Sequence, residues 1–132
     1  MKKMMTIAMT ALLMGSVALV GCGGNAAKSD TPSAVVQKAL SCAVQKDYKG
    51  MVKYFESSAA ATEAELDEAA AVLELLYSLS GGISEFEILG EEIEENGMEA
   101  EVKVKLTDLK GESRTDEADV VKTDQGWRLR MD

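Results

Sequence analysis

Acid–base chemistry in this sequence would have to come from carboxylates and tyrosines, because the chain contains no histidine. The absence of histidine excludes histidine-based proton transfer, serine triads and most zinc sites. Asp47 and Tyr48 form one adjacent carboxylate–phenol pair, and Tyr54 and Tyr77 add phenols at apolar helix positions. An aspartate before a helix usually caps it, and a tyrosine on an apolar helix face usually packs in the core. We therefore predict no catalytic residue.

A metal site is not expected either, although acidic residues gather between Glu85 and Glu95. A calcium loop needs alternating oxygen ligands around a central glycine, and this segment lacks that spacing. A solvated strand face that protects a sheet edge explains the charges better. Arg128 and Arg130, with Lys103 and Lys105, could bind an anion, but cross-strand pairs with Glu99, Glu101 and Asp119 are favoured. The sequence therefore predicts no metal and no cofactor.

Cys22 has the most specific chemical context in the chain. Lys2 and Lys3 precede an uncharged run from Met4 to Val20, which ends in the tetrapeptide Leu19-Val20-Gly21-Cys22. A basic start, an apolar stretch and a small-residue cleavage site are typical of a secretory signal. The run is shorter than the roughly 20 apolar residues of a spanning helix and is interrupted by polar residues. We therefore interpret it as a signal rather than a membrane span.

The tetrapeptide resembles the lipobox of bacterial lipoproteins. This resemblance implies lipidation of Cys22 on sulfur and cleavage after Gly21, so residues 1–21 are a signal peptide. Gly23, rather than aspartate, follows the cysteine, which favours the outer membrane and leaves the leaflet open. The expected location is the cell envelope, with the membrane as a partner through the lipidated cysteine.

Composition indicates one small acidic domain. Cleavage leaves 111 residues and removes two lysines, so the net charge changes from −9 to −11. Nucleic acid is not an expected partner, because phosphate binding needs a basic surface. Cys42 would be the single cysteine left after lipidation of Cys22, and its helix position predicts a packed, unpaired side chain, with a reactive or intermolecular thiol as the alternative.

Helical spacing dominates the first half of the mature chain. Residues 22–30 are small and polar and predict a flexible tether. Thr31-Pro32 starts a helix that runs to about Lys46, and Asp47 starts a second, short one. Thr62 and Glu65 match a capping box that opens a third helix, which ends at Ser80-Gly81-Gly82. We expect its inward face to include Leu66, Ala69, Ala70, Leu73, Leu76 and Tyr77, with Leu75 on the opposite side.

Alternation with a period of two begins at Ile83. One long strand is predicted over 83–95, with an irregularity at Gly90. Asn96-Gly97 is a strong hairpin signal, and a strictly alternating strand follows it. Two further strands are predicted over 112–122 and from Trp127 onward. The domain over residues 31–132 is therefore α+β, with three helices followed by an antiparallel meander of about four strands.

Two segments carry a further resemblance. Residues 39–55 (ALSCAVQKDYKGMVKYF) and residues 120–129 (VVKTDQGWRL) look like the first helices and the last hairpin of the nuclear transport factor 2-like, or cystatin-like, superfamily. With the lipobox, the layout is most similar to the small lipoproteins grouped as domain of unknown function 4878. The resemblance implies a cone in which helices pack on a strongly curved sheet, and such cones often enclose a pocket.

The functional expectation is a non-catalytic, lipid-anchored envelope domain that binds a small apolar ligand or a protein partner. The alternatives are an isomerase- or dehydratase-type enzyme of the same fold, and a structural or assembly protein that forms a homodimer through its outer sheet face. The residues expected to surround a pocket, or alternatively to fill a dry core, share large apolar or aromatic side chains: Tyr54, Phe55, Tyr77, Phe86, Met98, Trp127 and Met131.

Overall fold

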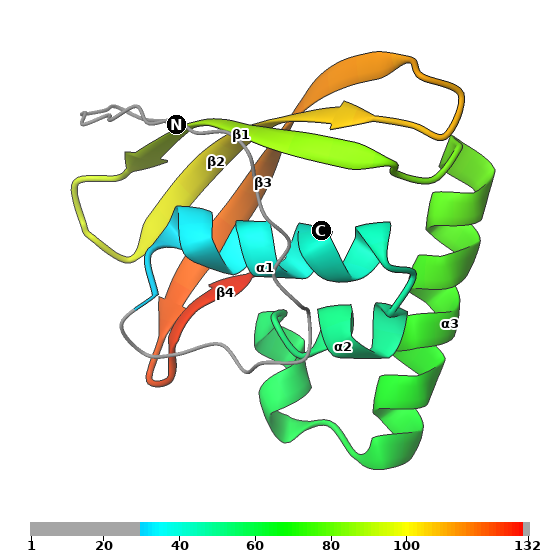
Figure 1. Cartoon of the computed structure of the whole chain (residues 1–132). Coiled ribbons are helices and arrows are strands. Elements are labelled where there is room, and N and C mark those ends of the chain that lie inside the picture. The colour runs from blue at the N-terminus through cyan, green and yellow to red at the C-terminus, as the bar shows by residue number, and fades with distance from the viewer. Residues whose placement is uncertain (1–29, 131–132) are drawn as a thin grey trace.

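The computed structural model describes residues 30–130, which form an α+β domain with three α-helices and one four-stranded antiparallel sheet (Figure 1). The expected signal peptide, Cys22, nearly all of the tether, and Met131 lie outside the described residues. The elements follow in the order α1 (Pro32–Val44), α2 (Tyr48–Val52), a 3₁₀ turn η1 (Glu56–Ala60), α3 (Glu63–Ser80), β1 (Glu85–Ile93), β2 (Glu99–Thr107), β3 (Ser113–Thr123) and β4 (Gly126–Leu129).

Side-chain caps fix the start of each α-helix where the sequence predicts it. The Ala34 N–H donates to Thr31 Oγ1 at 3.1 Å, and the Gly50 N–H donates to Asp47 Oδ1 at 3.0 Å. Thr62 and Glu65 form the complete reciprocal capping box of α3. Each cap satisfies a helix N–H that has no partner within the helix. The prediction that Asp47 acts as a cap is therefore confirmed.

The sheet is a simple meander in the order β1-β2-β3-β4. Its pairing slips by one residue between Ile88 and Gly90, which confirms the predicted irregularity and places a bulge at Leu89. The β1–β2 connection turns through Gly97, whose φ of +70° is a conformation that glycine adopts without strain. The first strand is shorter than expected and ends at Ile93.

The core lies between α1 and the inner face of the sheet. In Figure 1, α1 crosses in front of the strands, α2 lies below it, and α3 stands at the side. Helix α1 packs against β1, β2 and β4, whereas α3 packs mainly against α2. The inner face of β2 supplies four buried residues in strict alternation: Ala100, Val102, Val104 and Leu106.

Two predicted inward residues are at the surface. Leu76 is 50% exposed and Met98 is 52% exposed. Leu76 lies beside the face of α3 that contacts the rest of the domain, so helical spacing alone does not assign it. Met98 has the parity of the inner face of β2 but precedes the strand, in the turn after Gly97. Those two predictions are wrong because periodicity predicts which side of a helix or strand a side chain lies on and does not predict whether other residues bury that side.

Glu91 was expected on the solvated face of β1, and this expectation is also wrong. Its Oε1 accepts hydrogen bonds from the Ser33 N–H at 3.0 Å and from Ser33 Oγ at 2.7 Å. The bulge at Leu89 changes the parity of the strand, so Glu91 follows Ile88 on the inner face. A carboxylate at this position satisfies an N–H of the first turn of α1 and interacts favourably with the helix dipole.

Cys42 is completely buried, as its helix position predicts. It is disulfide-bonded, so the expectation of an unpaired thiol is corrected. An apolar helix position predicts burial of a cysteine and carries no information about whether its sulfur is paired. Among residues 30–130, no helix is long and apolar enough to cross a membrane.

Candidate binding pocket

A hollow of about 420 Å³ lies between the helices and the end of the sheet not covered by β4. This volume is within the range of small-molecule sites. Its walls come from every helix and from three strands, and most lining residues are apolar. The lining residues are Val36, Ala39, Leu40, Met51, Phe55, Tyr77, Val104, Leu106, Asp116, Glu117, Ala118, Asp119, Leu129 and Arg130.

One wall is built where β4 meets the chain that leaves α2. The Leu129 N–H donates to the Tyr54 carbonyl at 2.8 Å, and Phe55 forms a short parallel bridge with Leu129. These contacts hold the Phe55 and Leu129 side chains at one side of the pocket. The sequence must leave helical geometry after α2 for this bridge to form, and Phe55 is accordingly in extended backbone before η1.

The opposite wall is the edge of β3. Strand β4 pairs only with Val120–Thr123, so β3 extends past it. Residues 116–119 all line the pocket, and because successive strand side chains point to opposite faces, the backbone itself contributes to the wall. The Asp119 carbonyl accepts from the Arg130 N–H at 2.9 Å, on the β4 side. By alternation, the peptide groups of Glu117 point the same way.

The ionisable groups of the pocket are mainly acidic. Asp116 forms an ion pair with Arg114, with 3.1 Å between Oδ2 and Nε, and its side chain is 53% exposed. The Arg130 guanidinium approaches Glu56 at 3.6 Å and Glu99 at 3.8 Å. The second of these pairs was expected from the sequence. Because the single lining cation, among the described residues, already lies near two carboxylates, the pocket favours neutral or cationic molecules over anions.

Tyr77 lines the pocket from α3 and stacks on Tyr48, with 5.7 Å between ring centroids. Burial raises the pKa of the Tyr77 phenol above its ordinary value, and the neighbouring Tyr48 raises it further. The phenol therefore stays protonated in neutral solution and can donate a hydrogen bond, but it is a poor proton acceptor in that state.

The predicted pocket residues are divided among several places. Of that set, Phe55 and Tyr77 line the hollow. Tyr54 is 1% exposed and belongs to the core, which Phe86 borders. Met98 is at the surface, and Met131 is outside the described residues. The structure therefore brings two of the seven residues together at this site.

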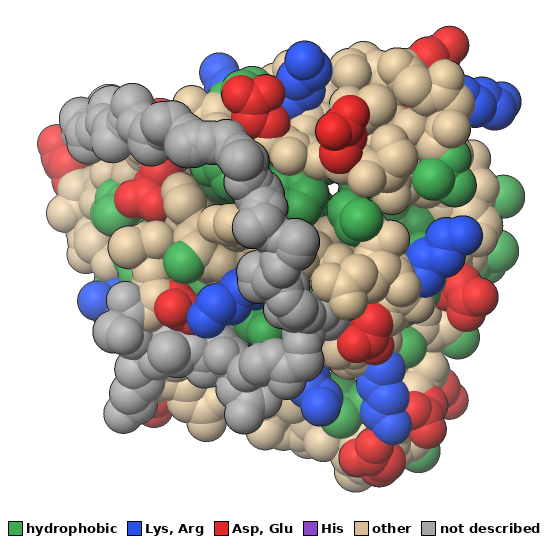
Figure 2. All heavy atoms as spheres, in the orientation of Figure 1, with side chains coloured by type: hydrophobic (Ala, Val, Ile, Leu, Met, Phe, Trp, Pro, Cys, Tyr) green, Lys and Arg blue, Asp and Glu red, His purple; other side chains and the backbone are tan. Residues whose placement is uncertain are grey.

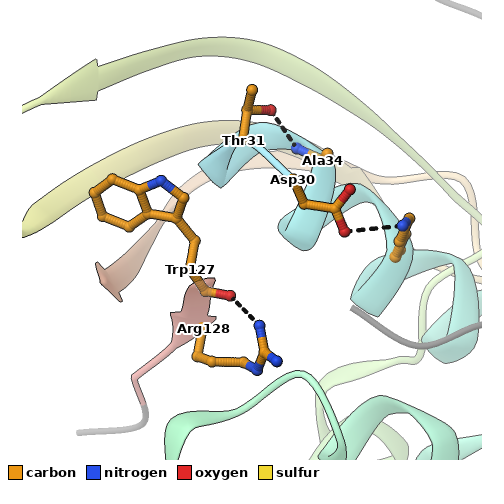
Figure 3. A network of polar contacts seen from close by, with 6 residues as sticks. Asp30, Thr31, Ala34, Trp127 and Arg128 are labelled. Atoms are coloured by element: carbon orange, nitrogen blue, oxygen red, sulfur yellow. Dashed lines mark hydrogen bonds and ion pairs between the residues drawn. The ribbon is translucent and has the colours of Figure 1, made fainter. Parts of the chain in front are cut away.

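Trp127 is buried, as the alternation predicts, but it does not line the hollow. Figure 3 shows its indole on the side of β4 that faces the start of α1, where Thr31 accepts from Ala34 and where Asp30 lies. Its carbonyl accepts from Arg128 Nη1 at 2.8 Å, and the Lys122 ammonium lies 5.7 Å from the ring centroid. Trp127 therefore closes the core at the β3–β4 hairpin.

Sequence reasoning missed the β3 wall of the pocket. Asp116 lies opposite Val104 in the sheet register and so shares the inner face with it. That parity could have been inferred from the alternation of β2 and a correct hairpin register. Among residues 30–130, no group of three or more acidic, cysteine or histidine side chains could hold a metal ion.

Comparison with known proteins shows which known fold this domain resembles. The crystal structure of a "Putative NTF2-like transpeptidase" from Campylobacter jejuni is similar, with a TM-score of 0.55 and 15% sequence identity. The match covers 78% of this chain and all of that one, and at this identity it shows an NTF2-like fold alone. No curated protein matches. A family model described as "Domain of unknown function (DUF4878)" matches residues 20–130, so the chain belongs to the DUF4878 family.

Proposed function

We propose that this protein is a non-catalytic, lipid-anchored domain of the cell envelope that binds a small, mainly apolar ligand in the hollow between α3 and β3. The observation that carries the proposal is the composition of the walls. Val36, Leu40, Met51 and Phe55 offer apolar surface, while the Asp116 carboxylate and the peptide groups of Glu117 lie on one side. Sites for small molecules commonly combine a large apolar area with a few polar groups at defined positions.

Charge narrows the class of ligand. Asp116 is the lining acidic residue of β3 whose side chain shares the inner face, and the lining residue Arg130 lies near Glu56 and Glu99. A sulfonate or carboxylate on the ligand would be repelled, whereas a neutral body with an amine or another hydrogen-bond donor would be favoured. The expected ligand is therefore apolar and neutral or cationic.

Fluorescent probes test this proposal. N-phenyl-1-naphthylamine is apolar and neutral, whereas 8-anilinonaphthalene-1-sulfonate has a similar body and a negative charge. Saturable binding of the first, and weaker binding of the second, is expected. Ala118→Leu should fill the hollow and weaken binding by about tenfold, which corresponds to about 1.4 kcal/mol. Ala71→Leu, on an exposed position of α3 away from the lining residues, is the matched control. Equal binding by both variants would contradict a ligand site here.

One observation favours the enzymatic alternative. Asp116 and Tyr77, a carboxylate and a phenol, both line the hollow, as an isomerase or dehydratase of this fold would require. Asp116 is half exposed and paired with Arg114, however, and a proton acceptor in such a site is usually more sheltered. If the alternative holds, Asp116→Asn should abolish turnover of a carbonyl or hydroxy substrate without changing probe affinity.

The lipid anchor rests on the resemblance of Leu19–Cys22 to a lipobox. Three acyl chains would exceed the two signals that stable anchoring needs. The intact mass of protein from the membrane fraction should correspond to residues 22–132 plus acyl groups, and Cys22→Ser should accumulate an unprocessed precursor. Because the sequence holds two cysteines and Cys42 is disulfide-bonded, a chain lipidated on Cys22 could keep that disulfide only with a cysteine of another chain. Recovery of a full-length chain without acyl groups would contradict the anchor.

A further inference from the structure

Helix α3 carries a second apolar stripe that no part of the described chain covers. Val72, Leu75, Leu76 and Leu79 are exposed to 51%, 58%, 50% and 77%, respectively. Their spacing of three and four residues places them on one face of the helix. The inward face of α3 is a different one, which includes Leu73 and Tyr77. Hydrophobic side chains reach the surface at the right-hand edge of Figure 2, where Figure 1 places α3.

A further exposed apolar residue, Leu109, lies next to the end of the helix. This residue lies in the β2–β3 turn, is 60% exposed, and donates its N–H to the Gly81 carbonyl at 3.1 Å. Five such side chains present on the order of 500 Å² of apolar surface, a size at which exposed patches usually mark interaction sites. Two copies of the patch would bury about 1,000 Å², near the lower bound for a specific interface.

The spacing of the stripe is symmetric about its own centre. When the helix is reversed about the point between Leu75 and Leu76, position 72 coincides with 79, and 75 coincides with 76. A two-fold axis pairs residue i with residue j and residue j with residue i, so an isologous interface needs a self-complementary patch. Two antiparallel copies of α3 can therefore pack Val72 of one copy against Leu79 of the other, with Leu75 and Leu76 beside the axis.

The charges of α3 fit the same arrangement. Glu63, Glu65, Asp67 and Glu68 are in its N-terminal half, whereas Glu74 is the single charge between positions 69 and 80. Antiparallel overlap of the C-terminal halves keeps the acidic halves at opposite ends of the pair. It also brings Glu68 of one copy to the level of position 83 of the other, near the turn that holds Lys110. The outer face of β2, by contrast, is charged along Glu99–Lys105 and offers no such apolar stripe.

We propose that the protein forms a two-fold homodimer through antiparallel packing of the exposed stripe of α3. This interface differs from the outer sheet face that the sequence suggested and is independent of the ligand pocket. Because both copies are acidic, association should strengthen as salt screens their repulsion. A membrane surface is a less suitable occupant, since helices that lie on membranes usually carry lysine and arginine on the polar face and α3 carries none.

Disulfide trapping tests both the contact between the two copies of α3 and their antiparallel orientation. Full-length chains carrying Val72→Cys and Leu79→Cys, with different epitope tags, are produced together and oxidised in isolated membranes. The mixture should form cross-linked heterodimers, because positions 72 and 79 face each other across the axis. Each variant alone should cross-link at least about tenfold more slowly, since identical positions are about 10 Å apart along the helices and a disulfide needs Cα atoms within about 7 Å.

The matched control pair is Ala71→Cys with Ser78→Cys, which has the same spacing on an exposed side of the helix away from the stripe. Wild-type chain reports the background of cross-linking that does not involve the introduced cysteines. Failure of the 72–79 mixture to cross-link would overturn the proposal, as would equal cross-linking of the control pair or of each single variant. If either variant loses resistance to proteolysis, Leu75→Cys with Leu76→Cys tests the same axis from adjacent positions.

Discussion

Helices α1 and α3 have similar apolar patterns and opposite environments. Eight of the thirteen residues of α1 are buried, whereas α3 buries one of eighteen. The difference follows from position, because α1 lies on the sheet between β1 and β4, while α3 stands beside it and packs mainly on α2. An apolar stripe therefore shows that a helix has apolar surface whose burial is favourable, but the tertiary fold determines whether residues of the same chain bury that surface.

The largest expected effect comes from a charge placed on each helix in turn. Val35 of α1 is 0% exposed, and Val35→Asp would bury a carboxylate without a prepared partner. The cost should approach the whole stability of a small domain, about 5–15 kcal/mol, so the variant should not fold. Val72→Asp on the exposed stripe should change the stability of the monomer by about 0.5 kcal/mol or less. Far-ultraviolet circular dichroism and urea unfolding measure both, and a folded Val35→Asp variant would contradict the assigned core.

The second comparison stays within α3. Leu73 is 4% exposed and Leu75 is 58% exposed. Leu73→Ala should destabilise by about 2–5 kcal/mol through lost burial and a cavity, whereas Leu75→Ala should cost about 0.5 kcal/mol or less in the monomer. Urea unfolding at low protein concentration gives both values. Equal losses would show that α3 does not pack as described, and a Leu75→Ala loss that grows with protein concentration would support the dimer.

The third comparison concerns the caps. Thr31→Ala and Thr62→Ala should each cost about 1 kcal/mol, but they should act differently. The start of α1 is also held by Glu91, which accepts from Ser33, while α3 depends on its capping box. Amide exchange should therefore accelerate in the first turn of α3 in Thr62→Ala and change little in α1 in Thr31→Ala. Equal acceleration in both helices would mean that Glu91 gives α1 no added protection.

The parts of the fold that sequence could predict depend on local signals. Thr31-Pro32, Asp47, the Thr62–Glu65 capping box and the alternation of β2 each fix an element through contacts within a few residues. The glycine after Leu89 correctly indicated an irregular strand. Its consequence, the rotation of Glu91 toward α1, depends on a helix some 58 positions away in the chain and could not be predicted from a strand pattern.

The pocket was harder to predict than the fold because it depends on where neighbouring elements end and leave space between them. The aromatic residues were expected to surround one pocket or fill one core, but Tyr54 and Trp127 fill the core, and of the aromatic set Phe55 and Tyr77 reach the hollow. The decisive feature is that β4 is shorter than β3, which leaves residues 116–119 as a wall. Strand lengths and registers of that kind arise from the whole sheet, and one alternating pattern does not reveal them.

The smallest expected effect compares the two tyrosines that join α2 to α3. In the folded protein the pKa of Tyr77 is raised, first by burial and then by Tyr48, and that of Tyr48 is raised by burial and then by Glu74. In the unfolded chain both should titrate near the ordinary value of about 10. Because the folded state resists ionisation, its stabilising contribution is complete below that pH and is lost as the pH rises through the folded-state pKa. The stability of the wild type, followed by Trp127 fluorescence in urea, should therefore decline above about pH 10, and the decline should be gentler in Tyr77→Phe.

Tyr48→Phe is the matched control, since it should make the decline gentler and also lower the pKa of Tyr77 in an ultraviolet titration. Parallel pH profiles for wild type and both variants would show that the stacked pair ionises as freely in the folded protein as in the unfolded chain.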